Sequence, residues 1–283
     1  MELIPTHEPL DEAAFEALVA LLRGRRVTAL TGAGCSTESG IPDYRGPVTR
    51  QKARNPIQYL EFMRKPEARQ RYWARSAVGW PRFRLARPNE THEALARLER
   101  VGALHGIITQ NVDRLHHAAG SHSVVELHGA LAQVKCTECG TYEDRDAVQA
   151  RILRDNPTWP PREAELAPDG DAELTGEVIE RFVVPACLAC GGVLKPYVVF
   201  FGENVPKPTV DAAWAMVDAS EVLLVVGSSL AIYSGYRFVL GAVERGQDVV
   251  IVNLGETRGD GHARLCVQGR AGEVMARLAD VLG

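Results

Sequence analysis

Residues 31–46 read TGAGCSTESGIPDYRG, and this stretch decides how the rest of the chain is interpreted. It follows the aliphatic run 27–30, which is typical of a buried parallel strand. Gly32 and Gly34 can turn the backbone sharply and let it approach a ligand where a Cβ atom would collide. The stretch therefore predicts a dinucleotide-binding turn that leads into a short helix. Three hydroxyl side chains open that helix, whose N-terminus can face a diphosphate: Ser36, Thr37 and Ser39.

The turn departs from the G-x-G-x-x-G fingerprint of hydride-transferring enzymes. Thr37 holds the place of the third glycine, and no second strand ending in a ribose-binding acid follows about 20 residues later. The next residues, 40–45, form a polar and aromatic segment that can fold over a cofactor. Taken alone, the glycine pair is equally consistent with an ordinary turn between a strand and a helix. A dehydrogenase is the function that we expect least.

Composition excludes several classes of protein. The chain has 283 residues, of which 46% are hydrophobic and 24% charged, as in soluble globular proteins. Its formal charge of −4 gives no support to a role on nucleic acid or on a membrane surface. No apolar run approaches the roughly 20 residues that span a bilayer. The acidic start at 1–18 argues against a secretory signal or a transit peptide, so we expect a cytoplasmic protein.

Hydrophobic periodicity predicts an α/β protein. Residues 11–23 place apolar side chains at helical spacing, and further helices are expected at 89–100, behind the N-cap Asn89, and at 235–245. Apolar strands that alternate with helices indicate a parallel sheet covered on both faces, with ligands at the carboxyl ends of the strands. The expected strands are 27–31, 105–109, 123–127, 195–201, 221–226 and 248–253.

Two insertions interrupt this alternation. Residues 43–88 are rich in arginine and aromatic residues and show no strand pattern, so we expect a loop and helices there. Residues 131–194 contain two cysteine pairs. We expect these two segments to form a smaller zinc-binding and helical domain, with a cleft between it and the larger domain. That larger, dinucleotide-binding domain would comprise residues 1–42, 89–130 and 195–283.

The cysteine pairs predict a metal site. Cys136 and Cys139, like Cys187 and Cys190, are separated by two residues and followed by glycine, a spacing that lets both thiolates of a pair face one ion. Four thiolates suit zinc in a closed site, so its role would be structural. Two disulfides or four free thiols are the alternatives. Cys35 and Cys266 have no partner in this pattern.

The glycine-rich stretch resembles the motif GAGxSxxSGIPDFRG of the sirtuins, NAD-dependent protein deacylases. Tyr44 stands where phenylalanine is usual in the family. The resemblance covers about residues 27–275, and it implies a Rossmann-like doubly wound sheet, a structural Zn²⁺ and NAD as a consumed co-substrate. Further matching segments follow in the family's order: TQNVD at 109–113, ELHG at 126–129, both CxxC pairs, VFFGE at 199–203, GSS at 227–229 and NLGE at 253–256.

His128 is the candidate general base. It ends the predicted strand 123–127 and is followed by Gly129, and a histidine near its ordinary pKa of about 6.5 can accept a proton at neutral pH. Alone, such a histidine is more often a hydrogen-bonded structural residue. The resemblance implies that the acyl-lysine oxygen attacks the nicotinamide ribose as nicotinamide leaves. His128 then takes a proton from the ribose hydroxyls, and the products are free lysine, nicotinamide and O-acyl-ADP-ribose.

The resemblance also implies the remaining cofactor contacts. Asn111 joins His128 as a catalytic residue, although Asn111 and Asp113 can alternatively cap a helix over 112–119. His116 and His117 are expected on the surface of that helix. The expected NAD contacts are Gly32, Ala33, Gly34, Ser36, Thr37, Asp43, Tyr44, Arg45, Gln110, Asn111, Val112, Asp113, Gly227, Ser228, Ser229, Asn253, Leu254, Gly255 and, near the C-terminus, Ala271.

Acylated lysine side chains of proteins are the expected substrates. The resemblance implies that the segment containing Phe201, Gly202 and Glu203 pairs with the substrate backbone, opposite residues that include Tyr233. Without the resemblance, Phe200-Phe201 would be interpreted as part of the hydrophobic core. Tyr72 and Arg75 share a helix face if their segment is helical, and in class III sirtuins such a pair recognises succinyl-type acids. A surface pair or a packing tyrosine is the alternative.

Other segments look like class II, the group of the mitochondrial sirtuin four: 69–81, 167–171 and 232–238. That class is credited with removing longer or branched acyl groups and lipoyl groups and with ADP-ribosyl transfer. The sequence therefore does not decide which acyl group is preferred. A protein mono-ADP-ribosyltransferase or a lipoamidase using the same site is the alternative function. A non-catalytic NAD- and zinc-binding sensor is less consistent with the intact His128 and Asn111.

Overall fold

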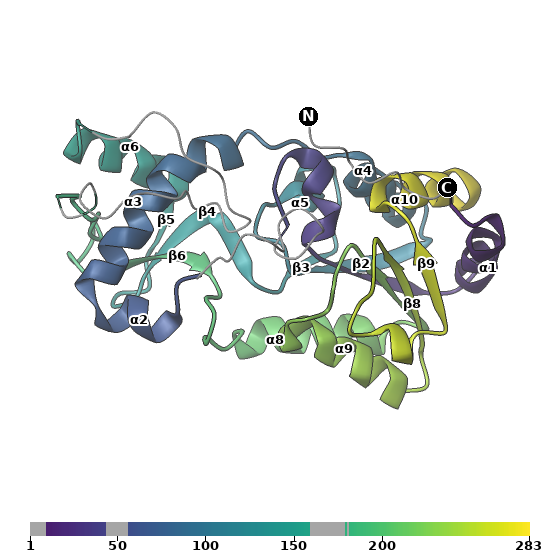
Figure 1. Cartoon of the computed structure of the whole chain (residues 1–283). Helices are drawn as coiled ribbons and strands as arrows, with labels where there is room; N and C mark the ends of the chain where they lie inside the picture. The colour runs from purple at the N-terminus through teal and green to yellow at the C-terminus, as the bar shows by residue number, and fades with distance from the viewer. Residues whose placement is uncertain (1–9, 44–55, 159–178, 180) are drawn as a thin grey trace.

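The computed structural model describes residues 10–43, 56–158, 179 and 181–283. Figure 1 shows two sheets at opposite ends of an elongated molecule. In the described residues, one sheet has six strands and the other has three. None of the described helices is both long and apolar enough to cross a membrane. The α/β fold predicted from hydrophobic periodicity is confirmed.

The larger sheet is entirely parallel, with the strand order β3-β2-β1-β7-β8-β9. The chain begins at the centre, adds β2 and β3 on one side, and later adds β7, β8 and β9 on the other. The order therefore reverses between β1 and β7, which is the point where such sheets bind ligands. The strands are β1 (Val27–Thr31), β2 (Leu104–Thr109), β3 (Val124–Glu126), β7 (Val222–Val226), β8 (Asp248–Asn253) and β9 (Leu265–Gln268).

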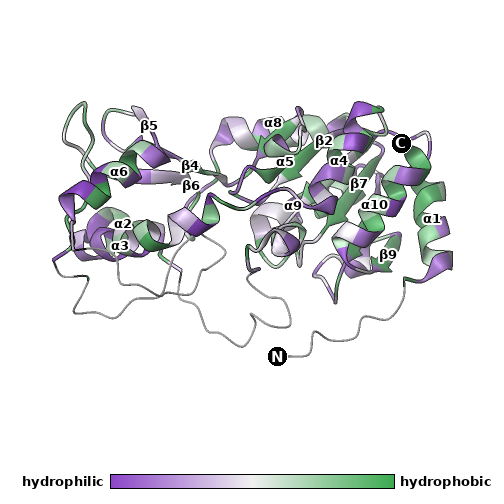
Figure 2. Ribbon diagram, turned by 90° about the horizontal axis from the view of Figure 1, so that it is seen from above, coloured by the Kyte–Doolittle hydropathy of each residue, from purple (hydrophilic) through white to green (hydrophobic). Residues whose placement is uncertain are grey.

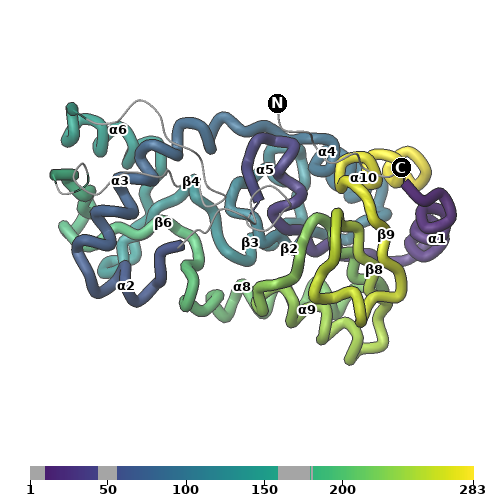
Figure 3. The backbone as a smooth tube through the Cα atoms, in the orientation of Figure 1, coloured from purple at the N-terminus to yellow at the C-terminus, as the bar shows by residue number. Residues whose placement is uncertain are grey.

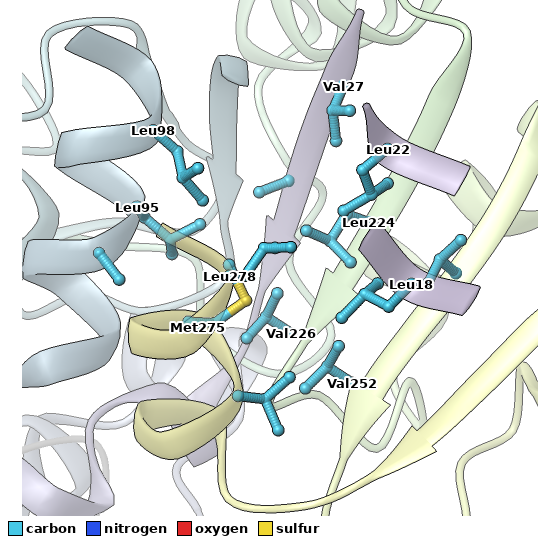
Figure 4. Close-up of a cluster of buried hydrophobic side chains, with 14 of the residues drawn as sticks. Leu18, Leu22, Val27, Leu95, Leu98, Leu224, Val226, Val252, Met275 and Leu278 are labelled. Carbon is cyan, nitrogen blue, oxygen red and sulfur yellow. The ribbon is translucent and has the colours of Figure 1, made fainter. Parts of the chain in front are cut away.

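Helices cover both faces of this sheet, which makes it doubly wound as expected. Figure 4 shows one face, where Leu18, Leu95 and Leu278 pack against Val226 and its neighbours. Figure 2 shows the strands of this sheet as mostly hydrophobic, and the two central strands β1 and β7 are buried along their whole length. The first face carries α1 (Glu12–Leu22), α4 (Glu90–Arg100) and α10 (Ala271–Leu282); the second carries α8 (Lys207–Asp218) and α9 (Tyr233–Glu244).

Two helices begin at acceptor side chains that cap them. Asn89 caps α4, as predicted, by accepting from the Thr91 N–H at 3.0 Å, and Asp11 caps α1 by accepting from the Ala13 N–H at 3.0 Å. The helix expected at 112–119 is shorter, since α5 comprises only Leu115–Ala118. The strand β9, which contains Cys266, was not expected from the sequence.

The smaller sheet is antiparallel, with the order β5-β4-β6. Its strands are β4 (Gly129–Cys136), β5 (Tyr142–Asp144) and β6 (Leu194–Val198). The strand predicted at 195–201 is therefore not part of the parallel sheet: it lies here, paired with β4, because the cysteine pairs at the far ends of both strands come together. The domain boundaries proposed from the sequence stay a prediction.

Among the described residues, three helices pack on the smaller sheet: α2 (Tyr59–Arg64), α3 (Pro66–Phe83) and α6 (Arg145–Asp155). Their shared core is aromatic and includes Phe62, Tyr72, Trp73 and Phe200. Figure 3 shows α2 and α3 beside β4 and β6, at the end of the molecule away from α1 and α10. The described part of 43–88 is thus helical, as expected, apart from an isolated bridge between Gln58 and Phe201.

Candidate active site and metal centre

Four loops meet at the carboxyl edge of the parallel sheet. In register, Thr31 lies opposite both Thr109 and Val226, and Val226 lies opposite Val252. The residue after each of these positions belongs to a predicted cofactor segment. The sheet therefore gathers Gly32, Gln110, Gly227 and Asn253 at one level, around the point where the strand order reverses.

The glycines of the first loop are required by its packing against the loop after β7. A Cβ atom on Gly32 would lie 2.7 Å from Ser228 Cβ, and one on Gly34 would lie 2.8 Å from Gly227 O. Gly227 has φ +59°, and a Cβ there would lie 2.6 Å from Cys35 N. The close approach that we expected to face a ligand faces the protein's own loop after β7, and the Gly34 N–H donates to Gly227 O at 2.8 Å.

A buried hydrogen-bond network joins the first loop to the loop after β2. Asn111 donates through Nδ2 to Gly32 O and to Ser36 Oγ, both at 3.0 Å. Ser36 in turn donates to Asp113 Oδ2 at 2.7 Å, while Asp113 Oδ1 accepts from the Leu115 N–H at 2.9 Å. Burial raises the pKa of Asp113. One carboxylate oxygen of Asp113 thus binds the first N–H of α5, whose N-cap position is Arg114, and the other oxygen holds the glycine loop.

His128 lies at the rim of this network, between two partners. Its Nδ1 is 2.9 Å from Gln110 O, and its Nε2 is 2.8 Å from Ser234 Oγ. A carbonyl oxygen can only accept, so Nδ1 carries the proton and the neutral ring presents its lone pair at Nε2. Burial lowers the pKa of His128, the bond to Gln110 opposes this, and the charge of Arg237 lowers it further. The side chain is therefore held neutral and able to accept a proton.

The other predicted cofactor residues lie around the same edge. Ser228 donates to Gln110 Oε1 at 2.8 Å, and Thr37 closes its turn by donating to Gly34 O at 3.0 Å. Asn253 shapes its loop by donating to Gly255 O at 2.9 Å, and Leu254 is exposed beside it. The remaining described ones are Ala33 in a short 3-10 helix, Val112 and Ser229 after their strands, Asp43 at the end of the described loop, and Ala271 at the start of α10. Tyr44 and Arg45 lie outside the described residues.

A cavity of about 480 Å³ adjoins His128 at the junction of the two sheets. Its lining includes Tyr59, Met63, Lys195 and Thr209 besides His128. The sequence predicted a cleft between the sheet and the inserted segments, and this cavity has residues from both.

The segment predicted to bind substrate borders the cavity and is held by an ion pair. Glu203 Oε2 accepts from Lys195 Nζ at 2.9 Å and from the Phe200 N–H at 2.8 Å. Gly202 has φ +79°, and Phe201 O accepts from the Tyr59 N–H at 2.9 Å. Lys195, which sequence reasoning missed, is thus the residue that fixes this turn. The sequence around Lys195 does not reveal this role, because Lys195 lies in a strand, two residues after an apolar valine. Its partner Glu203 comes close only when the chain turns back after β6.

Tyr72 and Arg75 both lie on α3, as their spacing predicted, but not as a surface pair. Tyr72 is 3% exposed, with ring centroids 5.6 Å from Phe62 and 5.3 Å from Phe200. Arg75 is half-buried, and its Nε is buried without a hydrogen-bond partner among the described residues. Tyr233, at the start of α9, is 61% exposed.

The four paired cysteines converge beyond β4 and β6, as predicted. Their sulfur atoms all lie within 4.8 Å of one another, with Cys136 to Cys190 at 3.6 Å and Cys139 to Cys187 at 3.7 Å. A tetrahedral zinc with bonds of about 2.3 Å requires sulfurs roughly 3.8 Å apart. A disulfide needs about 2.05 Å, so the disulfide alternative is wrong. These thiols can hold one structural zinc.

The glycine after each pair has the expected conformation. Gly140 and Gly191 have φ +75° and +74°, and their N–H groups donate to Cys136 O and Cys187 O. The two knuckles are therefore equivalent turns. The remaining cysteine of the glycine loop, Cys35, is fully buried and donates to Val226 O, and burial raises the pKa of its thiol to about 12.

Two histidines behind the glycine loop were not anticipated. His116, expected on a helix surface, is 1% exposed, and its Nε2 lies 2.9 Å from Thr31 Oγ1. His92 is fully buried, with its ring centroid 4.8 Å from that of His116. Burial lowers the pKa of His92 to about 4 and that of His116 well below its ordinary value. The short α5 turns one histidine of the His116-His117 pair inward, which its sequence does not reveal.

Comparison with known proteins identifies the family. The Sir2 family model matches residues 32–234. An NAD-dependent protein deacetylase of Xanthomonas campestris pv. campestris (strain 8004) is 53% identical over 256 residues, 90% of this chain and 87% of its own length. The mitochondrial NAD-dependent protein lipoamidase sirtuin-4 of Bos taurus is 48% identical over 96% of this chain and 88% of its own length.

Solved structures agree with these sequence relatives. A Sir2 structure with a p53 peptide and NAD+ superimposes with a TM-score of 0.75 at 32% identity, covering 94% of this chain and 98% of that one. The two-sheet architecture described above is thus shared with a protein that binds a peptide and NAD+.

Proposed function

The chain belongs to the Sir2 family, and from that premise we propose that it is an NAD-dependent protein-lysine deacylase in which His128 is the general base. It would transfer the acyl group of a modified lysine to ADP-ribose and release nicotinamide. The relatives at about 50% identity are NAD-dependent deacetylases and deacylases. Acylated lysine side chains of proteins are the substrates that this family membership supports.

The observation that carries the proposal is the state of His128. Its Nδ1–H is committed to Gln110 O, so Nε2 is the proton acceptor, at the rim of the glycine loop. NAD would supply the bond between nicotinamide and ribose, whose cleavage makes the sugar carbon reactive. Asn111, Ser36 and Asp113 support the site by tying the loops that follow β1 and β2 together.

Substitution of the base tests this function. His128→Ala should still bind NAD, because the glycine loop is held by Gly227 and Asn111 rather than by the imidazole. Its acyl-transfer rate should fall by about 10² to 10⁴, the usual contribution of a general base. The measurement is nicotinamide release that depends on an acyl-lysine peptide, with His105→Ala as the control, since His105 is exposed on β2 away from the site. A His128→Ala variant with undiminished turnover would contradict the assignment.

A lipoyl or other long acyl group is the second candidate. The relative of Bos taurus is named a lipoamidase, and the site resembles class II in the segment around Tyr233. Arg75 offers a buried Nε with no partner among the described residues, which instead suits an acyl group whose far end carries an oxygen, such as a succinyl group, and not a lipoyl group, which ends in a disulfide ring. A panel of acetyl-, succinyl- and lipoyl-lysine peptides, assayed on the wild type and on Arg75→Met, ranks these groups. If Arg75 binds the acyl group, the variant should lose activity on one of these peptides and keep its activity on the others.

The same experiments discriminate the other functions. Label from NAD that stays on a target protein, without acyl transfer, would indicate a mono-ADP-ribosyltransferase. NAD binding without any turnover would indicate a sensor. The cytoplasmic location stays a prediction.

A further inference from the structure

Ser234 is the second hydrogen-bond partner of His128. It contacts Nε2, the nitrogen through which the proposed base would accept a proton. Its hydroxyl lies 2.8 Å from His128 Nε2, the nitrogen left unprotonated by the bond from Nδ1 to Gln110 O. Imidazole Nε2 has a single lone pair in the ring plane, so Ser234 must be the donor and its oxygen keeps free acceptor capacity. The proton-accepting site of the base is therefore already filled by a hydroxyl of this chain.

The position of Ser234 is set by its surroundings. It is the second residue of α9, whose start is fixed against Gln110: a Cβ on the neighbouring Gly235 would lie 2.5 Å from Gln110 Nε2. Arg237 donates through Nε to Ser234 O at 3.1 Å. The residue that orients His128 from one side, Gln110, thus also positions the helix that approaches it from the other. Ser234 itself is half-buried, so a substrate hydroxyl can reach it.

We propose that Ser234 is a proton relay of the acyl-transfer step, through which His128 receives the proton of a substrate hydroxyl. This inference rests on the proposed function. The substrate O–H bond breaks and its proton binds Ser234 Oγ, while the Ser234 O–H bond breaks and its proton binds His128 Nε2. One proton moves in total, the serine hydroxyl is regenerated, and His128 becomes an imidazolium that still donates from Nδ1 to Gln110 O.

The chemistry of a hydroxyl suits this role in both states of the base. Ser234 donates to the neutral ring and can accept from the Nε2–H of the imidazolium, so the contact survives the transfer. Direct transfer to His128 would instead require the bond between Ser234 Oγ and His128 Nε2 to break first. The two routes make opposite predictions: removal of the hydroxyl slows a relay, whereas it leaves direct transfer unchanged or faster because the lone pair is released.

The test compares two steps in one protein. Ser234→Ala should reduce acyl transfer roughly tenfold or more, whereas exchange of labelled nicotinamide into NAD, which precedes the base step, should stay near the wild-type rate. Ser234→Thr keeps the hydroxyl and should retain most of the transfer rate. Tyr236→Phe is the matched control, because it removes another hydroxyl-to-imidazole bond of α9, from Tyr236 to His262 at 2.9 Å, away from His128.

A second readout needs no turnover. In the ligand-free protein labelled with ¹⁵N-histidine, the His128 Nε2 resonance should shift in Ser234→Ala as its hydrogen bond is lost, while Nδ1 stays protonated. Unchanged or faster transfer in Ser234→Ala would overturn the relay, and so would an equal loss of transfer and exchange, which indicates a structural role. If the wild type shows no exchange that depends on an acyl peptide, the proposed function itself fails.

Discussion

The parallel sheet and the three-stranded sheet contribute to the same cavity but are stabilised differently. The strands β1 and β7 are buried along their whole length, and the loops that follow them are packed against each other by glycine contacts. In the smaller sheet, β5 is largely exposed and β4 is only partly buried. Its far end depends on four thiols, and its near end on the pair of Lys195 and Glu203.

The difference indicates a division of roles. The edge where we propose that NAD binds is positioned by strands that apolar burial stabilises. The side that we propose faces the substrate depends on a few specific interactions that can each be removed. Four experiments test this contrast, from the largest expected effect to the smallest.

Loss of the metal should affect the smaller sheet most. Small structural zinc sites contribute free energies of about 10 kcal/mol. Cys190→Ser is the sharpest variant, because the Cys190 side chain is exposed and its loss disturbs no core. We expect zinc to be absent from the purified variant and acyl transfer to be lost, with NAD binding largely kept. Metal analysis and thermal unfolding measure this, and Cys266→Ser on β9 is the control. A fully active wild-type chain without zinc would contradict it.

Acid should lower the stability of the part of the molecule that contains the parallel sheet, because His92 and His116 are buried behind the glycine loop. The pKa of His92 is lowered from 6.5 to about 4, so between these values the unfolded chain binds more protons than the folded one. The stabilisation that His92 contributes is therefore fully present above pH 6.5. It is lost as the pH falls toward 4, which lowers the free energy of unfolding by about 3 kcal/mol from His92 alone. Denaturant unfolding at several pH values measures the slope. His92→Gln should flatten it, and an equal slope in that variant would refute the assignment.

A methyl group in the glycine loop should damage the cofactor edge specifically. In Gly34→Ala the new Cβ would lie 2.8 Å from Gly227 O, which is backbone and cannot rotate away. We expect a loss of about 1 to 3 kcal/mol in stability and weaker NAD binding, measured by calorimetry. Gly261→Ala is the control, since nothing lies within 4 Å of its added Cβ. Normal NAD affinity in Gly34→Ala would show that the loop contact is dispensable.

Removing one helix cap beside each sheet tests whether the two sheets unfold separately. Asp11 caps α1 beside the parallel sheet, and Asp144 caps α6 beside the smaller one, each through two backbone N–H groups. Replacement by alanine should cost about 1 kcal/mol in either case. If the sheets unfold in separate steps, Asp144→Ala should shift only the step that chelation also shifts. Identical effects of both variants on every step would mean that the molecule unfolds as one unit.

Much of the site was predictable, because its residues follow apolar strands in a chain whose alternation is clear. The glycine loop, His128 after β3 and the cysteine pairs all lie where the motifs placed them. The strand at 195–201 was assigned to the wrong sheet, since an apolar run does not reveal its partner. Tyr72 was left open between surface and core for a related reason: helical spacing shows which residues share a face, and not what covers that face.

The sequence by itself determined the alternation of strands and helices, the family, the four cysteines that can hold a metal and the position of the proposed base, because these depend on local spacing and on side-chain chemistry. Only the tertiary structure decided that Gly32 and Gly34 face Gly227 and Ser228, that His116 is buried beside His92, and that Ser234 reaches His128, from which it is 106 positions away in the chain. These contacts join segments far apart in the chain, and their geometry follows from sheet register and helix packing, which no local pattern encodes.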